Sequence, residues 1–163
     1  MKKIRFLALL GLLLFIIDRT TKYLALNIPQ EGVFLNDYIG LKLFYNPGIA
    51  FSIPLPNILN IFLAVIILAG LIYFLINSFY QKKLILSLPL ALVIIGSASN
   101  LIDRFRFGAV VDFISLSFWP AFNLADCYIV IGIILLIFNL KHYSAGASKT
   151  VIGEASAKQD CSK

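Results

Sequence analysis

The residues of this sequence best suited to chemistry are two carboxylates, Asp112 and Asp126, in apolar surroundings. Asp112 lies in 108–114, a run of β-branched and aromatic residues without an adjacent base, and Asp126 lies a turn or more inside an apolar segment. Desolvation disfavours the charged form of a carboxyl group, and two close carboxylates share one proton at neutral pH. One carboxylate then activates water as a base, while the protonated partner polarises a carbonyl group. Such a pair is the apparatus of an aspartic protease.

The chain between the two aspartates is short enough to bring both to one site. Thirteen residues separate them, and Trp119-Pro120 in this stretch is predicted to turn the chain back into the membrane. The structural alternative is that Asp126 pairs with a basic residue and locks two helices together. A charged side chain within a membrane costs about 2.5–3.5 kcal/mol by insertion scales, so such a residue is first considered functional.

Two further acidic residues are placed for ion pairing. Asp18 and Lys22 are spaced i, i+4, so they share one helix face and pair with each other. Asp103 next to Arg104 indicates a second local charge network, at the interface after the third apolar run. For these residues a structural role is expected at least as much as a direct one.

Three other kinds of catalytic site fit the sequence less well. The single histidine, His142, lies fifteen residues from Cys127, or roughly 22 Å along a helix, which is too far for a Cys/His pair. Zinc is not expected with one histidine, no H-E-x-x-H motif and no paired cysteines. A serine–lysine dyad stays open, although no spacing selects a pair among its candidates on the outer side: Ser52, Ser115, Ser117, Lys22 and Lys42.

Composition places these residues in a membrane protein. The chain has 163 residues, of which 60% are apolar and 13% charged, and its mean hydropathy is +0.92. A soluble domain of this size cannot bury so much apolar surface. The net charge of +6 does not indicate nucleic acid as a partner, because the basic residues lie at the ends of apolar runs and not on one face.

Four apolar segments are long enough to cross about 30 Å of hydrocarbon, which takes roughly 20 residues. These segments are 6–26, 58–78, 84–102 and 122–140. The first, which follows Lys2, Lys3 and Arg5, resembles a secretory signal peptide, but no small-x-small cleavage site follows it, so a retained helix is expected. The predicted fold class is therefore an all-α membrane protein with four transmembrane helices.

The charges of the connections predict the orientation of these helices. With four spans both termini share one side, where nine Lys and Arg residues lie against five on the other, which places both termini in the cytoplasm. Six acidic residues, including Asp112 and Asp126, fall on the outer side, and only Glu154 and Asp160 lie inside. The outer face of the membrane therefore collects nearly all of the potential chemistry.

Two segments lie outside the predicted spans. The outer connection, about 27–57, mixes β-favouring and turn-forming residues in 33–53, which predicts a small, half-buried extracytoplasmic β-sheet on the membrane surface. The tail 144–163 is rich in Ser, Ala, Gly and Lys without periodicity, which predicts a disordered cytoplasmic segment after a single domain, 1–143. Cys127 lies in an apolar run and Cys161 in this tail, so no disulfide is expected between them.

Five short motifs, in order, resemble those of the lipoprotein signal peptidases, also called signal peptidase II. They cover residues 1 to about 142 and are Asp18-x-x-x-Lys22, Asn46-Pro47-Gly48-Ile49-Ala50-Phe51-Ser52, Asn100-Leu101-Ile102-Asp103-Arg104, Val110-Val111-Asp112-Phe113-Ile114 and Phe122-Asn123-Leu124-Ala125-Asp126. Before its Asn-x-x-Asp-Arg motif that family has a glycine-rich run. This chain has Gly96-Ser97-Ala98-Ser99 there, and these residues are still small enough for close helix packing.

The resemblance implies an aspartic endopeptidase of the bacterial inner membrane that cleaves prolipoproteins before their diacylglyceryl-modified cysteine. It implies Asp112 and Asp126 as the catalytic pair. No metal or cofactor is expected, because the sequence offers no convincing set of ligands. The residues implied to line the substrate site are Asn46, Gly48, Asn100, Asp103, Arg104 and Asn123, with Asp18 and Lys22 in support. The expected partners are lipid-modified prolipoproteins and membrane lipid, and the expected assembly is a monomer.

Two non-enzymatic functions remain as alternatives. A small transporter or proton relay using Asp18, Asp112 and Asp126 would place ionisable groups near the midplane or on both sides of it, whereas these cluster at one interface. An assembly factor would use the outer loop to bind a partner, with the aspartates as helix locks. An Asp112→Asn protein that folds and inserts but processes no substrate would contradict both.

Overall fold

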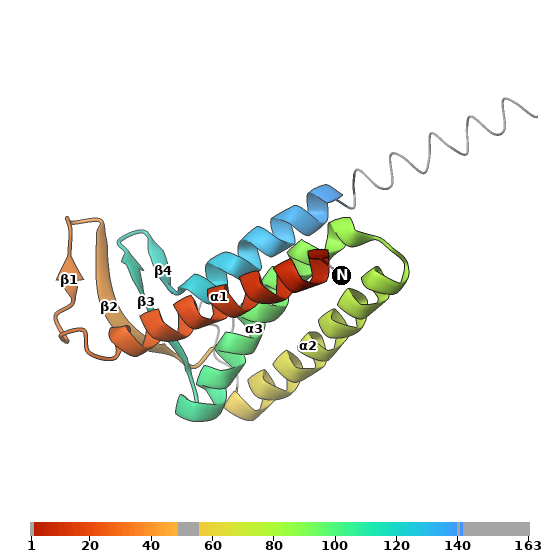
Figure 1. Ribbon diagram of the computed structural model, residues 1–163. Helices are drawn as coiled ribbons and strands as arrows, with labels where there is room; N and C mark the ends of the chain where they lie inside the picture. Colours follow the sequence, from red (N-terminus) through yellow and green to blue (C-terminus); the bar gives the residue numbers. More distant parts are fainter. Residues whose placement is uncertain (1, 49–55, 140, 142–163) are drawn as a thin grey trace, which may run out of the picture.

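Helices form most of the structure, and a small sheet lies at one end of them (Figure 1). The computed structural model describes residues 2–48, 56–139 and 141. Its helices are α1 (Lys2–Ala25), α2 (Asn57–Tyr80), the short 3₁₀ helix η2 (Leu84–Leu86), α3 (Ser87–Phe107) and a C-terminal helix, Leu124–Asn139. Its strands are β1 (Val33–Phe34), β2 (Ile39–Asn46), β3 (Val110–Leu116) and β4 (Trp119–Phe122).

The surface of α2 is apolar, whereas its few buried residues are polar. Only Asn60 and Ser78 of α2 are buried, while Phe62 and Phe74 are 59% and 58% exposed. In water this arrangement would expose apolar surface at a large cost in free energy, but in lipid the apolar side chains meet a matching solvent. The fold of α2 is therefore that of a helix surrounded largely by lipid.

Two segments of the described chain are long and apolar enough to cross a membrane. They are α2 and Leu84–Phe107, which joins η2 to α3. The C-terminal helix is apolar but shorter, and α1 carries charged residues near both of its ends. The four-span topology therefore remains a prediction.

The end of α3 carries the chain directly into the sheet. Gly108 follows the last helical residue in the left-handed conformation, at a φ of 73°, and its N–H donates to the Arg104 carbonyl at 3.1 Å. β3 begins two residues later. The prediction of a third helix that ends at 102 is therefore too short, because Asp103 and Arg104 lie within α3.

The four strands form one antiparallel sheet in the order β1-β2-β3-β4. β2 pairs with β3 so that Phe44 lies opposite Asp112 and Tyr45 opposite Val111. The Tyr45 ring also contacts the Phe107 ring, with centroids 6.0 Å apart, which fastens the sheet to the end of α3. The prediction that confined the sheet to 33–53 is wrong in extent, because β3 and β4 come from the segment that carries Asp112.

The segment between the two aspartates is a hairpin. β3 and β4 are joined by a turn at 117–118, so the predicted turn at Trp119-Pro120 is two residues too late. Proline is compatible with β4 because this is an edge strand. Phe122 ends β4, so the last helix begins at Leu124 and not at 122. The predictions for Ser52, His142, Cys161 and the tail 144–163 lie outside the described residues.

Candidate active site

Asp112 lies in β3 with its side chain held by two asparagines. The residue is 2% exposed and lies between Val111 and Phe113, which are also buried. Asn123 donates from Nδ2 to Asp112 Oδ1 at 2.6 Å, and Asn46, at the end of β2, donates from Nδ2 to Oδ2 at 3.1 Å. Each carboxylate oxygen of Asp112 therefore faces an amide donor.

Asp126 lies in the first turn of the C-terminal helix and helps to cap it. Asn123 precedes this helix, and its Oδ1 accepts the Asp126 N–H at 3.0 Å. In return, Asp126 Oδ2 accepts the Asn123 N–H at 3.1 Å. This reciprocal pair is a capping box in which aspartate replaces the usual glutamate. The backbone geometry of the helix start therefore determines where the Asp126 carboxylate lies.

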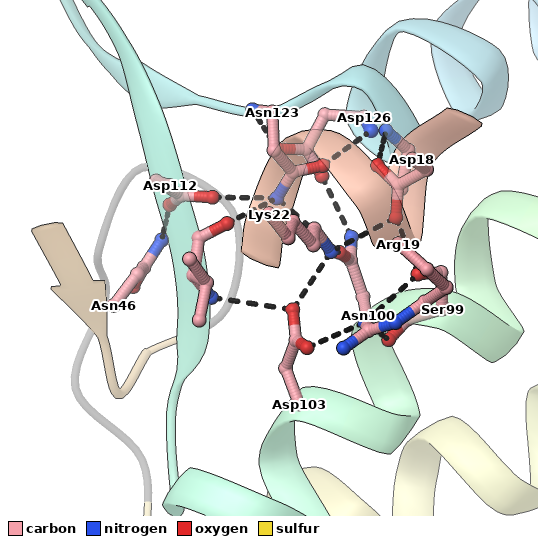
Figure 2. Close-up of polar contacts among 12 residues, drawn as sticks. Asp18, Arg19, Lys22, Asn46, Ser99, Asn100, Asp103, Asp112, Asn123 and Asp126 are labelled. Carbon is pink, nitrogen blue, oxygen red and sulfur yellow. Dashed lines mark hydrogen bonds and ion pairs between the residues drawn. The ribbon is translucent and has the colours of Figure 1, made fainter. Parts of the chain in front are cut away.

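One asparagine thus contacts both aspartates (Figure 2). Asn123 is fully buried, and it bonds to Asp112 through its side-chain amide and to Asp126 through its backbone. Asn100 of α3 holds the other oxygen of Asp126, donating from Nδ2 to Oδ1 at 2.8 Å. The fold therefore brings a carboxylate from a strand and a carboxylate from a helix to one site.

The surroundings of Asp112 favour its protonated form. Burial, and after it the negative charge of Asp126, raise the pKa of Asp112 from 3.8 to about 6, although hydrogen bonds from Asn46 and Asn123 lower it. A shift of this kind is typical of two carboxylates that share a proton. The pair therefore has the electrostatics that general acid–base chemistry requires.

Four charged residues lie behind this pair. Lys22 of α1, which is 1% exposed, contacts Asp103 at 2.7 Å and Asp18 at 3.4 Å. Arg19 pairs with Asp103 at 2.6 Å. The four formal charges cancel, which lowers the cost of burying them. Asp18 also links the cluster to the C-terminal helix, because its Oδ1 accepts the Ala125 N–H at 2.8 Å.

The cluster also supports the backbone next to Asp112. Asp103 Oδ2 accepts the N–H of Val111, the residue before Asp112, at 3.3 Å. α1 contributes neither aspartate of the pair, but it contacts the elements around them. Asp18 bonds to the C-terminal helix that carries Asp126, and Lys22 bonds to Asp103, which supports the strand that carries Asp112.

Both aspartates line a cavity of about 420 Å³. Three other predicted site residues, Asn46, Asn100 and Arg104, lie on its wall, and Arg104 Nη2 donates to the Gly48 carbonyl at 3.2 Å. Much of the remaining wall is apolar and comes from α2, β4 and the C-terminal helix: Ala64, Ile67, Trp119, Phe122, Ile129 and Val130. A cavity with carboxylates at one end and an apolar wall suits a peptide with apolar side chains.

The other predicted residues support the cavity from behind. The Gly48 N–H donates to Asn46 Oδ1 at 3.0 Å and so orients that side chain. Asn123 lies between the aspartates, and Asp103 lies in the buried cluster with Asp18 and Lys22. Asp103 and Asn123, which the resemblance implies as lining residues, are therefore placed to support those that do line the cavity.

Arg19 and Ser99 belong to the site but are not among the predicted residues. Ser99 donates to the Asp18 carboxylate and accepts from Arg19 Nη1 at 3.1 Å. Spacing was the available signal, because Arg19 lies three residues before Lys22 and Ser99 four residues before Asp103. Such intervals place side chains on one helix face.

The contacts of Lys22, Lys42 and Ser117 do not favour a serine–lysine dyad. Lys22 is engaged by two carboxylates and by Asn100. The Lys42 ammonium lies 5.8 Å from the centre of the Phe44 ring, and Ser117 Oγ donates to the Asp37 carbonyl at 2.5 Å. The aspartate pair is therefore the better candidate for catalysis.

The sequence is similar to a group of known bacterial proteins. A family model described as signal peptidase (SPase) II matches residues 10–141. The lipoprotein signal peptidase of Moorella thermoacetica is 40% identical over 136 residues, which are 81% of this chain and 90% of that protein. The lipoprotein signal peptidase of Syntrophus aciditrophicus is 36% identical over 153 residues, which are 86% of this chain and 95% of that protein.

The fold is similar to that of a solved protein as well. A structure described as a bacterial membrane enzyme, obtained by the in meso method, matches with a TM-score of 0.79 and 28% sequence identity. The match covers 88% of this chain and 92% of the other. The sequence is therefore similar to lipoprotein signal peptidases, and the fold is similar to that of a bacterial membrane enzyme.

Proposed function

The chain belongs to the signal peptidase II family, aspartic-type peptidases that remove signal peptides from prolipoproteins, and we propose that Asp112 and Asp126 carry out this reaction in it. The observation that supports this assignment is the joint position of the two carboxylates. They line one cavity, they are linked by Asn123, and each oxygen is restrained by an N–H donor.

The pair acts as acid and base on one peptide bond. The ionised carboxylate takes a proton from water, and the water oxygen forms a bond to the scissile carbonyl carbon. The protonated carboxyl group gives its proton to the carbonyl oxygen in the same step. The tetrahedral intermediate then returns a proton to the pair and breaks its C–N bond as the leaving nitrogen is protonated. The pair ends as it began, with one shared proton.

The proposed cleavage site is the bond before the diacylglyceryl-modified cysteine of a prolipoprotein. A lipid anchor holds that bond at a fixed depth, at the outer interface of the membrane. An enzyme with its aspartates at the same depth gains positioning from the bilayer itself and needs no soluble cleft. The apolar wall of the cavity, which includes Ile67 and Ile129, suits the apolar part of such a substrate.

The proposed topology has four spans, both termini in the cytoplasm and the sheet outside, and the enzyme acts as a monomer. Lys82 and Lys83 support this orientation because they lie in the connection from α2 to α3. That connection and the N-terminus lie at the end of the helices away from the sheet (Figure 1). Reporter fusions at Gln81 and Tyr143 that report the outer side would contradict it.

The assignment of the pair is tested by cleavage of a diacylglyceryl-modified prolipoprotein by the purified protein in lipid. Asp112→Asn and Asp126→Asn should each abolish cleavage but keep membrane insertion and substrate binding, because asparagine keeps the shape and cannot exchange a proton with water. The double variant should be no worse than either single variant, since residues that act as a unit are non-additive.

The matched control is Asp37→Asn, an exposed aspartate of the loop before β2. It should cleave like the wild type. Near-normal turnover by Asp126→Asn would contradict the aspartic mechanism and favour a serine–lysine dyad.

A further inference from the structure

We propose that the proton of the catalytic pair is held by Asp112, that Asp126 is the ionised member that activates water, and that Lys22 sets this order through Asn100. The inference rests on the proposed function, which names the pair but not the role of each member. The directions of the hydrogen bonds around the two carboxylates carry it. In this scheme Lys22 is a positioning residue, because it acts on Asp126 through another side chain.

Lys22 determines which way the side-chain amide of Asn100 points. An ammonium group has only donors, so the Asn100 atom that lies 2.7 Å from Lys22 Nζ has to be its oxygen. Asn123 Nδ2, at 3.2 Å, donates to the same oxygen. The NH₂ group of Asn100 is therefore left for Asp126, where it donates to Oδ1 at 2.8 Å. The chain from Lys22 through Asn100 to Asp126 runs in one direction only (Figure 2).

The hydrogen bonds of Asp126 and its place at the start of a helix favour its ionised form. Both of its oxygens accept N–H groups, one from Asn100 and the other from the Asn123 backbone. The residue lies in the first turn of a helix, where the positive end of the helix dipole favours an anion. The Lys22 cation polarises the Asn100 amide and strengthens it as a donor.

Asp112 has a weaker set of donors. Its closest donor, Asn123 Nδ2, also serves the oxygen of Asn100. Its other donor, Asn46, is oriented by a neutral group, because Asn46 Oδ1 accepts the Gly48 N–H at 3.0 Å. Asp112 lies in a strand, and strands have only small dipoles. Asp112 is therefore the member that keeps the proton when one carboxylate ionises.

The remaining charges near the pair do not reverse this order. The charged groups of α1 and α3 near the pair are Asp18, Arg19, Lys22, Asp103 and Arg104. Asp18 repels an ionised Asp126. However, Lys22 Nζ lies 3.4 Å from the Asp18 carboxylate and offsets the negative charge of Asp18. Arg104 lines the cavity and interacts with both members of the pair. The charge of Lys22 also lowers the pKa of Asp112, but its hydrogen-bonded path through Asn100 leads to Asp126.

The roles of the two aspartates in the reaction follow. Asp126 takes the proton from water as the water oxygen bonds to the carbonyl carbon, and Asp112 gives its proton to the carbonyl oxygen. In the second step Asp112 takes a proton back from the tetrahedral intermediate. Asp126 then protonates the leaving nitrogen as the C–N bond breaks.

The test is the pH profile of kcat/KM for cleavage of a diacylglyceryl-modified prolipoprotein. Its acidic limb reports deprotonation of the base, and its alkaline limb reports deprotonation of the acid. Lys22→Met removes the cation, and Asn100→Ala removes the donor while it leaves the Lys22 ion pairs in place. Each variant should move the acidic limb upward by about one pH unit or more, and Asn100→Ala should leave the alkaline limb nearly unchanged. Lys22→Met should also raise the alkaline limb, but by less than the acidic limb, because the charge of Lys22 acts on Asp112 as well. Lys22→Arg retains the cation and should restore most of the wild-type limb.

The matched control is Thr21→Ala, whose hydroxyl in the wild type donates to carbonyls of its own helix, those of Ile17 and Asp18. It should leave both limbs in place. A fall of kcat/KM at every pH in Asn100→Ala, with both limbs unmoved, would mean that the relay is only structural and would overturn the inference. Because Asn100→Ala keeps the ion cluster, it carries the test even where Lys22→Met fails to fold.

Infrared titration identifies the proton holder directly. The carboxylic-acid C=O band of the wild type that disappears near pH 6 should be missing from Asp112→Asn. Its persistence in Asp112→Asn would overturn the inference. The two proposals fail separately: normal cleavage by either aspartate variant contradicts the catalytic pair, whereas inactive aspartate variants with unmoved pH limbs contradict only the role of Lys22.

Discussion

The Cα atom of Gly96, in α3, lies against the backbone carbonyl of Ala125. A Cβ atom on Gly96 would overlap that carbonyl oxygen and would come within 2.8 Å of Ile129 Cγ1. Ala125 is the residue before Asp126, and its N–H donates to Asp18. α3 and the C-terminal helix therefore approach each other closely beside one member of the proposed catalytic pair.

Gly96→Ala should reduce kcat by about tenfold or more. The group in the way is backbone, so the start of the C-terminal helix has to move, and displacement of a catalytic group by a fraction of an ångström is costly. Cleavage of the lipid-modified substrate measures the effect on kcat, and thermal unfolding in detergent measures the effect on stability.

Two other glycines separate this effect from general packing. Gly70→Ala in α2 should keep wild-type activity and gain a little stability, because nothing lies within 4 Å of its added Cβ and alanine favours helix by about 0.5–1 kcal/mol. Gly132→Ala would bring its Cβ within 2.8 Å of the Pro89 carbonyl, so it should lose stability while it keeps most of kcat. Equal losses of kcat in Gly96→Ala and Gly132→Ala would contradict a local effect on Asp126.

The activity should fall as the pH rises above the pKa of Asp112. Polarisation of the scissile carbonyl requires the protonated form of this residue, whose pKa is about 6. Above that pH, kcat/KM should decrease by about tenfold per pH unit. Measurement of kcat/KM at constant lipid composition from about pH 5 to 9 decides the matter. A profile that rises across this range would mean that catalysis needs the ionised form of Asp112.

The raised pKa of Asp112 also makes the stability depend on pH. The folded protein holds this proton more tightly than the unfolded chain, so its contribution to stability is complete below 3.8 and is lost as the pH rises through about 6. Asp112→Asn cannot ionise. Its stability relative to the wild type should therefore increase between about pH 4 and 7, by on the order of 3 kcal/mol. Thermal unfolding that shows a constant difference over this range would contradict the expectation.

Asp18→Asn, in contrast to Asp112→Asn, should lose stability relative to the wild type. It leaves Lys22 with an incomplete set of partners in a buried cluster, and breaking a buried ion pair costs about 3–5 kcal/mol. The variant should be less stable than the wild type at every pH and should keep some turnover. Unfolding and cleavage measured on the same preparation would show whether the two losses separate.

Cleavage should not depend on a divalent metal. Each of the four carboxylate oxygens of Asp112 and Asp126 already accepts an N–H group, so a bound cation would meet the positive ends of these donors. The rate should stay the same after treatment with a chelator. Loss of cleavage that one particular divalent ion restores would contradict this mechanism.

The features that could be predicted from the sequence are those that leave a local pattern. The helices follow from long apolar runs, and the pairing of Asp18 with Lys22 follows from i, i+4 spacing, which is confirmed by their separation of 3.4 Å. Asp112 and Asp126 could be predicted as site residues because each is a carboxylate within an apolar run, which is also a local pattern.

The rest depends on contacts between distant parts of the chain. The β-branched residues around Asp112 are evident in the sequence. Their partner strand, however, ends at Asn46, 66 residues before Asp112, and no local pattern predicts that pairing. The double role of Asn123 depends on a helix that begins at Leu124. A boundary placed two residues too early, at 122, hides the capping residue.

The buried charge cluster has a consequence for the order in which the chain is synthesised. α1 leaves the ribosome long before Asp103, so it must wait in the membrane without the carboxylate that later engages Arg19. In the meantime Asp18 and Lys22 neutralise each other within one helix. Arg19 then pairs with Asp103 when α3 arrives in the observed register, whereas a shifted α3 would separate the two charges. The cluster therefore favours the one register of α3 against α1 that places Asn100 and Asp103 beside Lys22.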